Sequence, residues 1–127
     1  MGYYVNIELR NVVVPAANRT ACLAAVNSLH TVDRWHSWVR PPETGKFSNL
    51  VEAFTEWRYE VDVDNEGNIR LNYFNGEKWG DDETLYATIA PFVADSSIMV
   101  IGEDGDIWGY EFENGSMFET RCVMQRA

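Results

Sequence analysis

The sequence has few of the features that mark secreted, membrane-spanning or metal-bound proteins. It contains only two cysteines, Cys22 and Cys122, and their wide separation gives neither a disulfide framework nor the paired spacing of a zinc site. No apolar run is long enough for a signal peptide or a membrane-spanning helix. We therefore expect a cytoplasmic protein.

Basic residues are also scarce. Ten Lys and Arg residues stand against twenty Asp and Glu residues, for a formal net charge of −10. The excess lies in one half, because residues 1–58 contain six basic and five acidic residues, whereas residues 59–127 contain four and fifteen. Proteins that bind nucleic acids through phosphates, or bind anionic membranes, need the opposite sign. We expect neither as a direct partner.

The motifs of the common enzyme classes are missing as well. The chain has no phosphate-binding glycine loop, no H-E-x-x-H and no G-x-S-x-G elbow. Asp62, Asp64 and Glu66 have the opening spacing of a calcium loop, but Tyr73 stands where that loop needs its last carboxylate. We predict no catalytic residues, no metal and no cofactor, and we favour a non-enzymatic protein.

Apolar and aromatic residues are abundant. The sequence is 46% hydrophobic and includes five Trp, six Tyr and six Phe residues, enough to form a core for a single domain over residues 1–127. Residues 3–9 alternate as a strand, and residues 12–14 extend it. Apolar residues at helical spacing predict helices over residues 16–30 and 50–58, the second with Ser48 or Asn49 as N-cap and Glu52 placed for a capping box behind Asn49.

The second half of the chain has strand alternation interrupted by turns. Residues 59–63 and 69–73 predict a hairpin, and residues 82–93 predict a helix with an irregular last turn at Pro91. Asp-Gly and Asn-Gly turns then separate strands over 97–101, 107–112 and 117–124. The order β-α-α-β-β-α-β-β-β indicates an α+β fold: an antiparallel sheet with a C-terminal meander, covered on one face by helices.

Residues 31–48 form a long connection with an unusual composition. It has no helix or strand period and carries Trp, His and Arg side chains in an acidic protein. Trp and Arg are enriched at the energetic centres of interfaces, although two tryptophans can also simply close over a core. The candidate partner-binding residues here are Arg34, Trp35, His36, Trp38 and Arg40.

Acidic residues supply a second candidate surface. If the hairpins lie side by side, their carboxylates form one negative face that can occupy the positive groove of a nucleic-acid-binding protein. Solubility explains such a face equally well. The predicted acidic face consists of Asp62, Asp64, Glu66, Asp81, Asp82, Glu83, Glu103, Asp104 and Asp106.

Two stretches resemble small, largely uncharacterised α+β proteins of phages and bacteria. One is the opening Met1-Gly2-Tyr3-Tyr4-Val5, and the other runs from Phe74 through the turns at 103–105 and 113–115. The resemblance supports the α+β order and implies a phage or prophage origin, with the host cytoplasm as the place of action. It supplies no catalytic residues.

These observations favour a non-enzymatic acidic binding protein. We expect a phage-encoded inhibitor or modulator of a host or defence protein, with a basic, nucleic-acid-binding protein as a possible partner. One alternative is a ligand-binding protein or enzyme with a pocket beside residues 31–48. Another is an accessory subunit that pairs through an edge strand, either residues 3–9 or residues 117–124.

Overall fold

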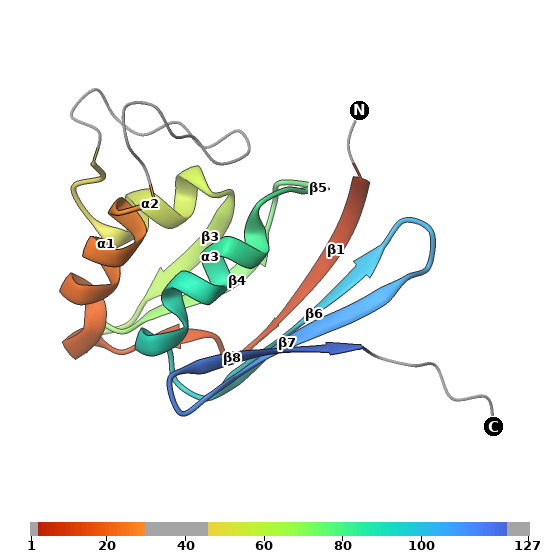
Figure 1. The fold of residues 1–127 in the computed structure, drawn as a ribbon. Helices are drawn as coiled ribbons and strands as arrows, with labels where there is room; N and C mark the ends of the chain where they lie inside the picture. Colours follow the sequence, from red (N-terminus) through yellow and green to blue (C-terminus); the bar gives the residue numbers. More distant parts are fainter. Residues whose placement is uncertain (1–2, 30–45, 122–127) are drawn as a thin grey trace.

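A computed structural model describes residues 3–29 and 46–121 of the chain. These residues form one small α+β domain with two antiparallel sheets, and the helices lie to one side of the larger sheet (Figure 1). The five-stranded sheet has the order β5 (Lys78–Trp79), β1 (Tyr3–Arg10), β6 (Ser96–Gly102), β7 (Ile107–Glu113) and β8 (Ser116–Arg121). The three-stranded sheet has the order β2 (Val13–Val14), β4 (Ile69–Phe74) and β3 (Tyr59–Val63).

The break between β1 and β2 produces the second sheet. The expected continuation of the first strand through residues 12–14 does not occur, because Asn11 adopts a left-handed conformation with φ 58°. Asparagine tolerates this region better than most residues. The chain turns there, and Val13 and Val14 pair with Arg70 and Ile69 of β4 instead of extending the first ladder.

The predicted helices are present with slightly different bounds. Helix α1 (Arg19–Asn27) follows a 3₁₀ turn, η1 (Ala16–Asn18), and α2 (Leu50–Glu56) begins at Asn49. The Asn49 side chain accepts a hydrogen bond from the Glu52 N–H at 2.8 Å, and the Glu52 carboxylate accepts one from the Ser48 N–H at 3.2 Å. This is the expected capping box, shifted by one residue at its return bond.

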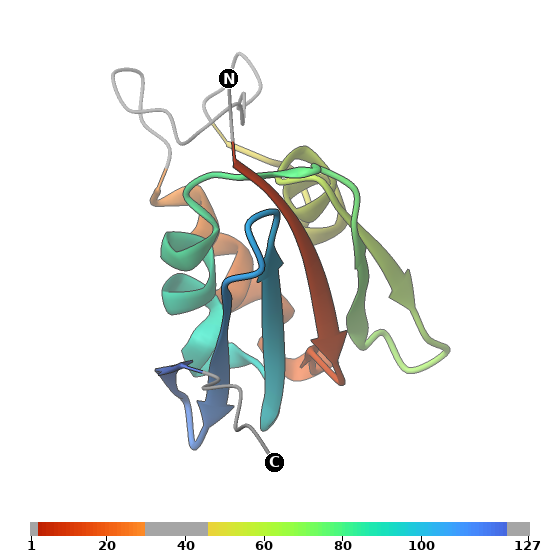
Figure 2. The same cartoon turned by 90° about the vertical axis from the view of Figure 1, so that its right-hand side faces the viewer.

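The third helix packs into the curl of the larger sheet. Helix α3 (Asp82–Ile89) ends in the 3₁₀ turn η2 (Ala90–Phe92), where Pro91 was expected to disturb it. Its Tyr86 ring makes edge contacts with Tyr110 and Phe112 of β7, at centroid distances of 5.2 and 6.4 Å. Figure 2 shows the meander of β6, β7 and β8 with α3 beside it. The meander predicted from the turn dipeptides is confirmed.

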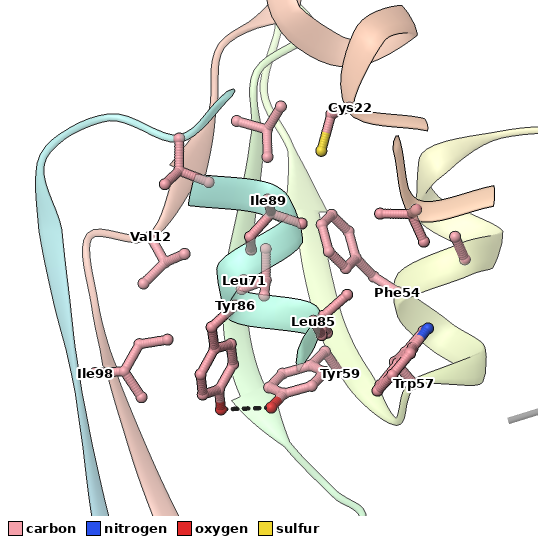
Figure 3. Packing of buried hydrophobic residues seen from close by; sticks show 14 of the residues in the cluster. Val12, Cys22, Phe54, Trp57, Tyr59, Leu71, Leu85, Tyr86, Ile89 and Ile98 are labelled. Atoms are coloured by element: carbon pink, nitrogen blue, oxygen red, sulfur yellow. Dashed lines mark hydrogen bonds between the residues drawn. The ribbon is translucent and has the colours of Figure 1, made fainter. Parts of the chain in front are cut away.

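One core joins the helices to both sheets. It includes Cys22 and Val26 of α1, Phe54 of α2, and Leu71 of β4, all with at most 1% of their surface exposed (Figure 3). Burial also raises the pKa of the Cys22 thiol to about 12, so this cysteine has the character of a packed apolar side chain rather than of a nucleophile.

Candidate functional site

Seven of the fifteen acidic residues that follow residue 58 lie near the start of β1. Strand β5 and the β6–β7 turn contact the first residues of β1, and Glu83 of α3 and Glu119 of β8 line a groove with Trp79 of β5. Tyr3 bonds to Asp104, the Tyr4 N–H donates to Glu103 at 3.1 Å, and the Val5 N–H donates to the Glu77 carbonyl at 2.9 Å. We call this region the acidic end and define it by the exposed carboxylates Glu77, Asp81, Glu83, Glu103, Asp104, Asp106 and Glu119.

The nine acids predicted to share one face are divided by the fold. Asp81, Glu83, Glu103, Asp104 and Asp106 lie at the acidic end. Asp62, Asp64 and Glu66 lie on the β3–β4 hairpin, whose turn packs beside Ala16 and Arg19 at the far end of the strands (Figure 1). Asp82 is only 3% exposed and contributes to no surface.

The carboxylate of Asp64 organises its own turn. Its Oδ1 accepts hydrogen bonds from the Glu66 and Asn68 N–H groups, and Oδ2 accepts one from the Asn68 side chain at 3.0 Å. These donors lower the pKa of Asp64. Among the side chains that the structure describes, no three His, Cys, Asp or Glu groups are placed to hold a metal ion.

The Trp-rich candidate surface lies elsewhere in the chain. Arg34, Trp35, His36, Trp38 and Arg40 fall outside the described residues. The partner-binding role expected for them stays a prediction.

A groove opens at the acidic end, on the concave side of the five-stranded sheet. It has a volume of about 260 Å³, and we call it the inner groove. The Trp79 ring of β5 stands nearly perpendicular to the Trp108 ring of β7, with 5.4 Å between centroids, and lies nearly parallel to the Tyr110 ring at 6.3 Å. The lining residues are Trp79, Glu83, Asp106, Trp108, Tyr110 and Glu119.

Hydrogen bonds fix the polar tips of these rings. Trp108 Nε1 donates to the Tyr110 hydroxyl at 3.1 Å, and this hydroxyl donates to Glu83 Oε1 at 2.9 Å. Burial and the bond to Glu83 raise the pKa of Tyr110, so its proton stays in place. Because these two polar groups are engaged with one another, the groove offers ring surfaces and carboxylate oxygens.

A second recess, the outer groove, lies on the other side of the first residues of β1. Its volume is about 220 Å³, and Tyr4 and Tyr73 line it with 47% and 57% of their surfaces exposed. Glu77 and Glu103 add carboxylates. Glu77 has φ 66° within a tight turn closed by a 2.7 Å bond from the Lys78 N–H to the Gly76 carbonyl. Backbone strain of this kind is concentrated at functional sites.

A buried hydrogen-bonded cluster lies behind the inner groove. The Tyr59 hydroxyl lies 2.6 Å from the Tyr86 hydroxyl (Figure 3). It donates to Asp82 Oδ1 at 2.9 Å, and the Gly80 N–H donates to Asp82 Oδ2 at 3.0 Å. Burial raises the pKa of Asp82 and of both tyrosines. The cluster joins α3 to β3. Because all three side chains are closed to solvent, it offers no access to a substrate.

The sequence did not predict either groove. The groove aromatics come from two segments, β7 for Trp108 and Tyr110 and β5 for Trp79, and only the pairing of β5 with β1 brings Trp79 to the sheet edge. A two-residue strand has no detectable period. The available signal was indirect: aromatic residues adjoin the acids of residues 77–83 and 103–108.

Comparison of the chain with protein-family models, characterised proteins and solved structures finds no match. Within residues 3–29 and 46–121, no helix is both long and apolar enough to cross a membrane. The class defined by fold and site is therefore a small α+β protein with an acidic, aromatic-lined end.

Proposed function

We propose that this protein is a non-enzymatic binding protein that engages a positively charged protein partner through its acidic end. The observation that carries the proposal is the meeting of seven exposed carboxylates with two grooves that expose aromatic rings. Carboxylates steer a basic partner towards the surface, and aromatic rings supply contact area once it is bound. A role in solubility would require charged side chains but no ordered aromatic recess. The combination of the two therefore favours a binding role.

The resemblance to phage and bacterial proteins suggests the setting. In that setting the partner is a host or defence protein, and a nucleic-acid-binding protein has the required positive groove. The carboxylates occupy one end of the molecule and not a continuous face, because the β3–β4 hairpin carries the others away. We therefore propose that the acidic end makes a compact contact that blocks a basic site on the partner. It does not mimic an extended nucleic-acid duplex.

Capture from lysate with matched charge variants tests the proposal. Glu77→Gln, Glu103→Gln and Glu119→Gln together remove three charges from the acidic end while keeping side-chain shape. Asp62→Asn, Glu66→Gln and Glu113→Gln remove three charges from exposed positions elsewhere. We expect the unmodified protein and the second variant to retain the same basic partner in a salt-sensitive manner, and the first variant to lose it. Equal retention by both variants would contradict the proposal.

A second candidate function rests on the sheet edge. Among the described strands, β8 ends the order β5-β1-β6-β7-β8 and pairs only with β7, and its Phe118 is 52% exposed. An unpaired edge can add a strand from another chain. This accessory-subunit alternative predicts a concentration-dependent dimer, or a complex that Phe118→Lys weakens, whereas the acidic-end proposal predicts no effect of that change.

A further inference from the structure

The inner groove has the geometry of a site for a planar group. Its two tryptophan rings meet at 85°, so one ring face forms a floor and the other forms a wall. Tyr3 extends the wall, since its ring lies 6.3 Å from that of Trp108. Tyr110, which also lines the groove, lies nearly parallel to Trp79. A flat group entering the corner can lie on the face of one ring and present its own edge to the face of the other.

The charged side chains that line this corner are all acidic. Glu83 comes from α3, Asp106 from the β6–β7 turn and Glu119 from β8, so three separate elements each bring a carboxylate to the same groove. None of the six lining residues is basic. Acids at a helix start suit the helix dipole, which accounts for Glu83 alone. The convergence of acids from a turn and a strand on aromatic rings indicates a cationic occupant.

We propose that the inner groove receives the guanidinium group of an arginine from the basic partner. This inference rests on the proposed function and specifies its central contact. A guanidinium is planar, stacks on aromatic faces and has five N–H donors for surrounding carboxylates. An ammonium is a compact, strongly hydrated charge with three N–H donors, and it has no planar face to lie on the floor of the groove. The arginine stacks on the tryptophan surface and donates to Glu83 and Glu119.

The tryptophan indole N–H signals in a ¹⁵N–¹H NMR spectrum report directly on the groove. The probe is a capped Gly-Arg-Gly tripeptide, compared with its lysine and citrulline counterparts, because citrulline keeps the shape of arginine without its charge. We expect the signals of Trp79 and Trp108 to shift with a dissociation constant on the order of millimolar. The signal of Trp57, only 2% exposed, serves as an internal reference.

Lysine should bind more weakly and citrulline should produce no saturable shift. Glu83→Gln and Glu119→Gln should each weaken arginine binding by about tenfold, the effect of losing one charge-assisted contact. Glu113→Gln, at the far end of β7, should leave it unchanged. Glu83→Gln keeps an acceptor for the Tyr110 hydroxyl, so the groove should stay folded.

Three results would overturn the assignment: no shift with arginine, equal shifts with arginine and citrulline, or saturable shifts with a neutral hexose in place of arginine. The outcome is separable from the proposed function. If the acidic end captures a basic partner while arginine leaves both indoles unmoved, the binding function stands and the arginine site falls. If arginine binds but no basic partner is captured, the groove is a cation site outside the proposed interface.

Discussion

The charge state of one buried carboxylate, that of Asp82, affects the stability of the fold. Asp82 accepts bonds from the Tyr59 hydroxyl and the Gly80 N–H, yet burial still raises its pKa. Charging it inside the fold is therefore unfavourable relative to the unfolded chain. Protonated Asp82 favours the fold, so its contribution is complete below the unfolded pKa and is lost as pH rises through the folded value.

Asp82→Asn tests this sign. We expect the free energy of unfolding of the native protein, minus that of the variant, to decrease as pH rises above the ordinary aspartate range. The measurement is urea denaturation over a pH series. Asp64→Asn is the matched control of opposite sign, because hydrogen bonds lower the pKa of Asp64 and its contribution is lost as pH falls. A pH-independent difference for Asp82→Asn would show that the carboxylate is not perturbed.

At the scale of secondary-structure elements, backbone conformation and distant pairing determine strand boundaries that the periodicity of the sequence did not predict. Alternation located β1, the β3–β4 hairpin and the meander, and capping residues located α2. The apolar residues 12–14 were expected to extend β1, but one left-handed residue, Asn11, diverts them to another sheet. Two-residue strands such as β5 form through partners far along the chain, so local propensity carries no signal for them.

The end of α2 carries a strained residue that can be relieved. Arg58 follows the C-cap Trp57 and has φ 73°, in the region that glycine adopts without steric cost. Arg58→Gly should raise the free energy of unfolding by about 0.5–1 kcal/mol, measured by chemical denaturation. Arg70→Gly, in the extended strand β4, should lower it. Destabilisation by Arg58→Gly would mean that side-chain contacts outweigh the backbone strain.

At the scale of the whole molecule, only the three-dimensional fold brings acidic side chains together with the aromatic grooves. The sequence identified acidic segments and an excess of negative charge after residue 58, and five of the nine predicted acids do meet at one end. It could not show that three others lie on a hairpin directed away, or that Asp82 is buried. It also could not show that Trp79, Trp108 and Tyr110 form a corner beside the remaining acids.

Site-specific photo-crosslinking in the cells that contain the protein tests the acidic-end interface most directly. A photoreactive phenylalanine analogue replaces either Tyr73, exposed in the outer groove, or Val63, exposed at the end of β3 beside the hairpin turn. We predict that the probe at position 73 crosslinks to one discrete basic protein, that the probe at 63 does not, and that Glu77→Gln with Glu103→Gln abolishes the crosslink. A partner captured only from position 63, or unaffected by those substitutions, would contradict the claim that the acidic end is the binding surface.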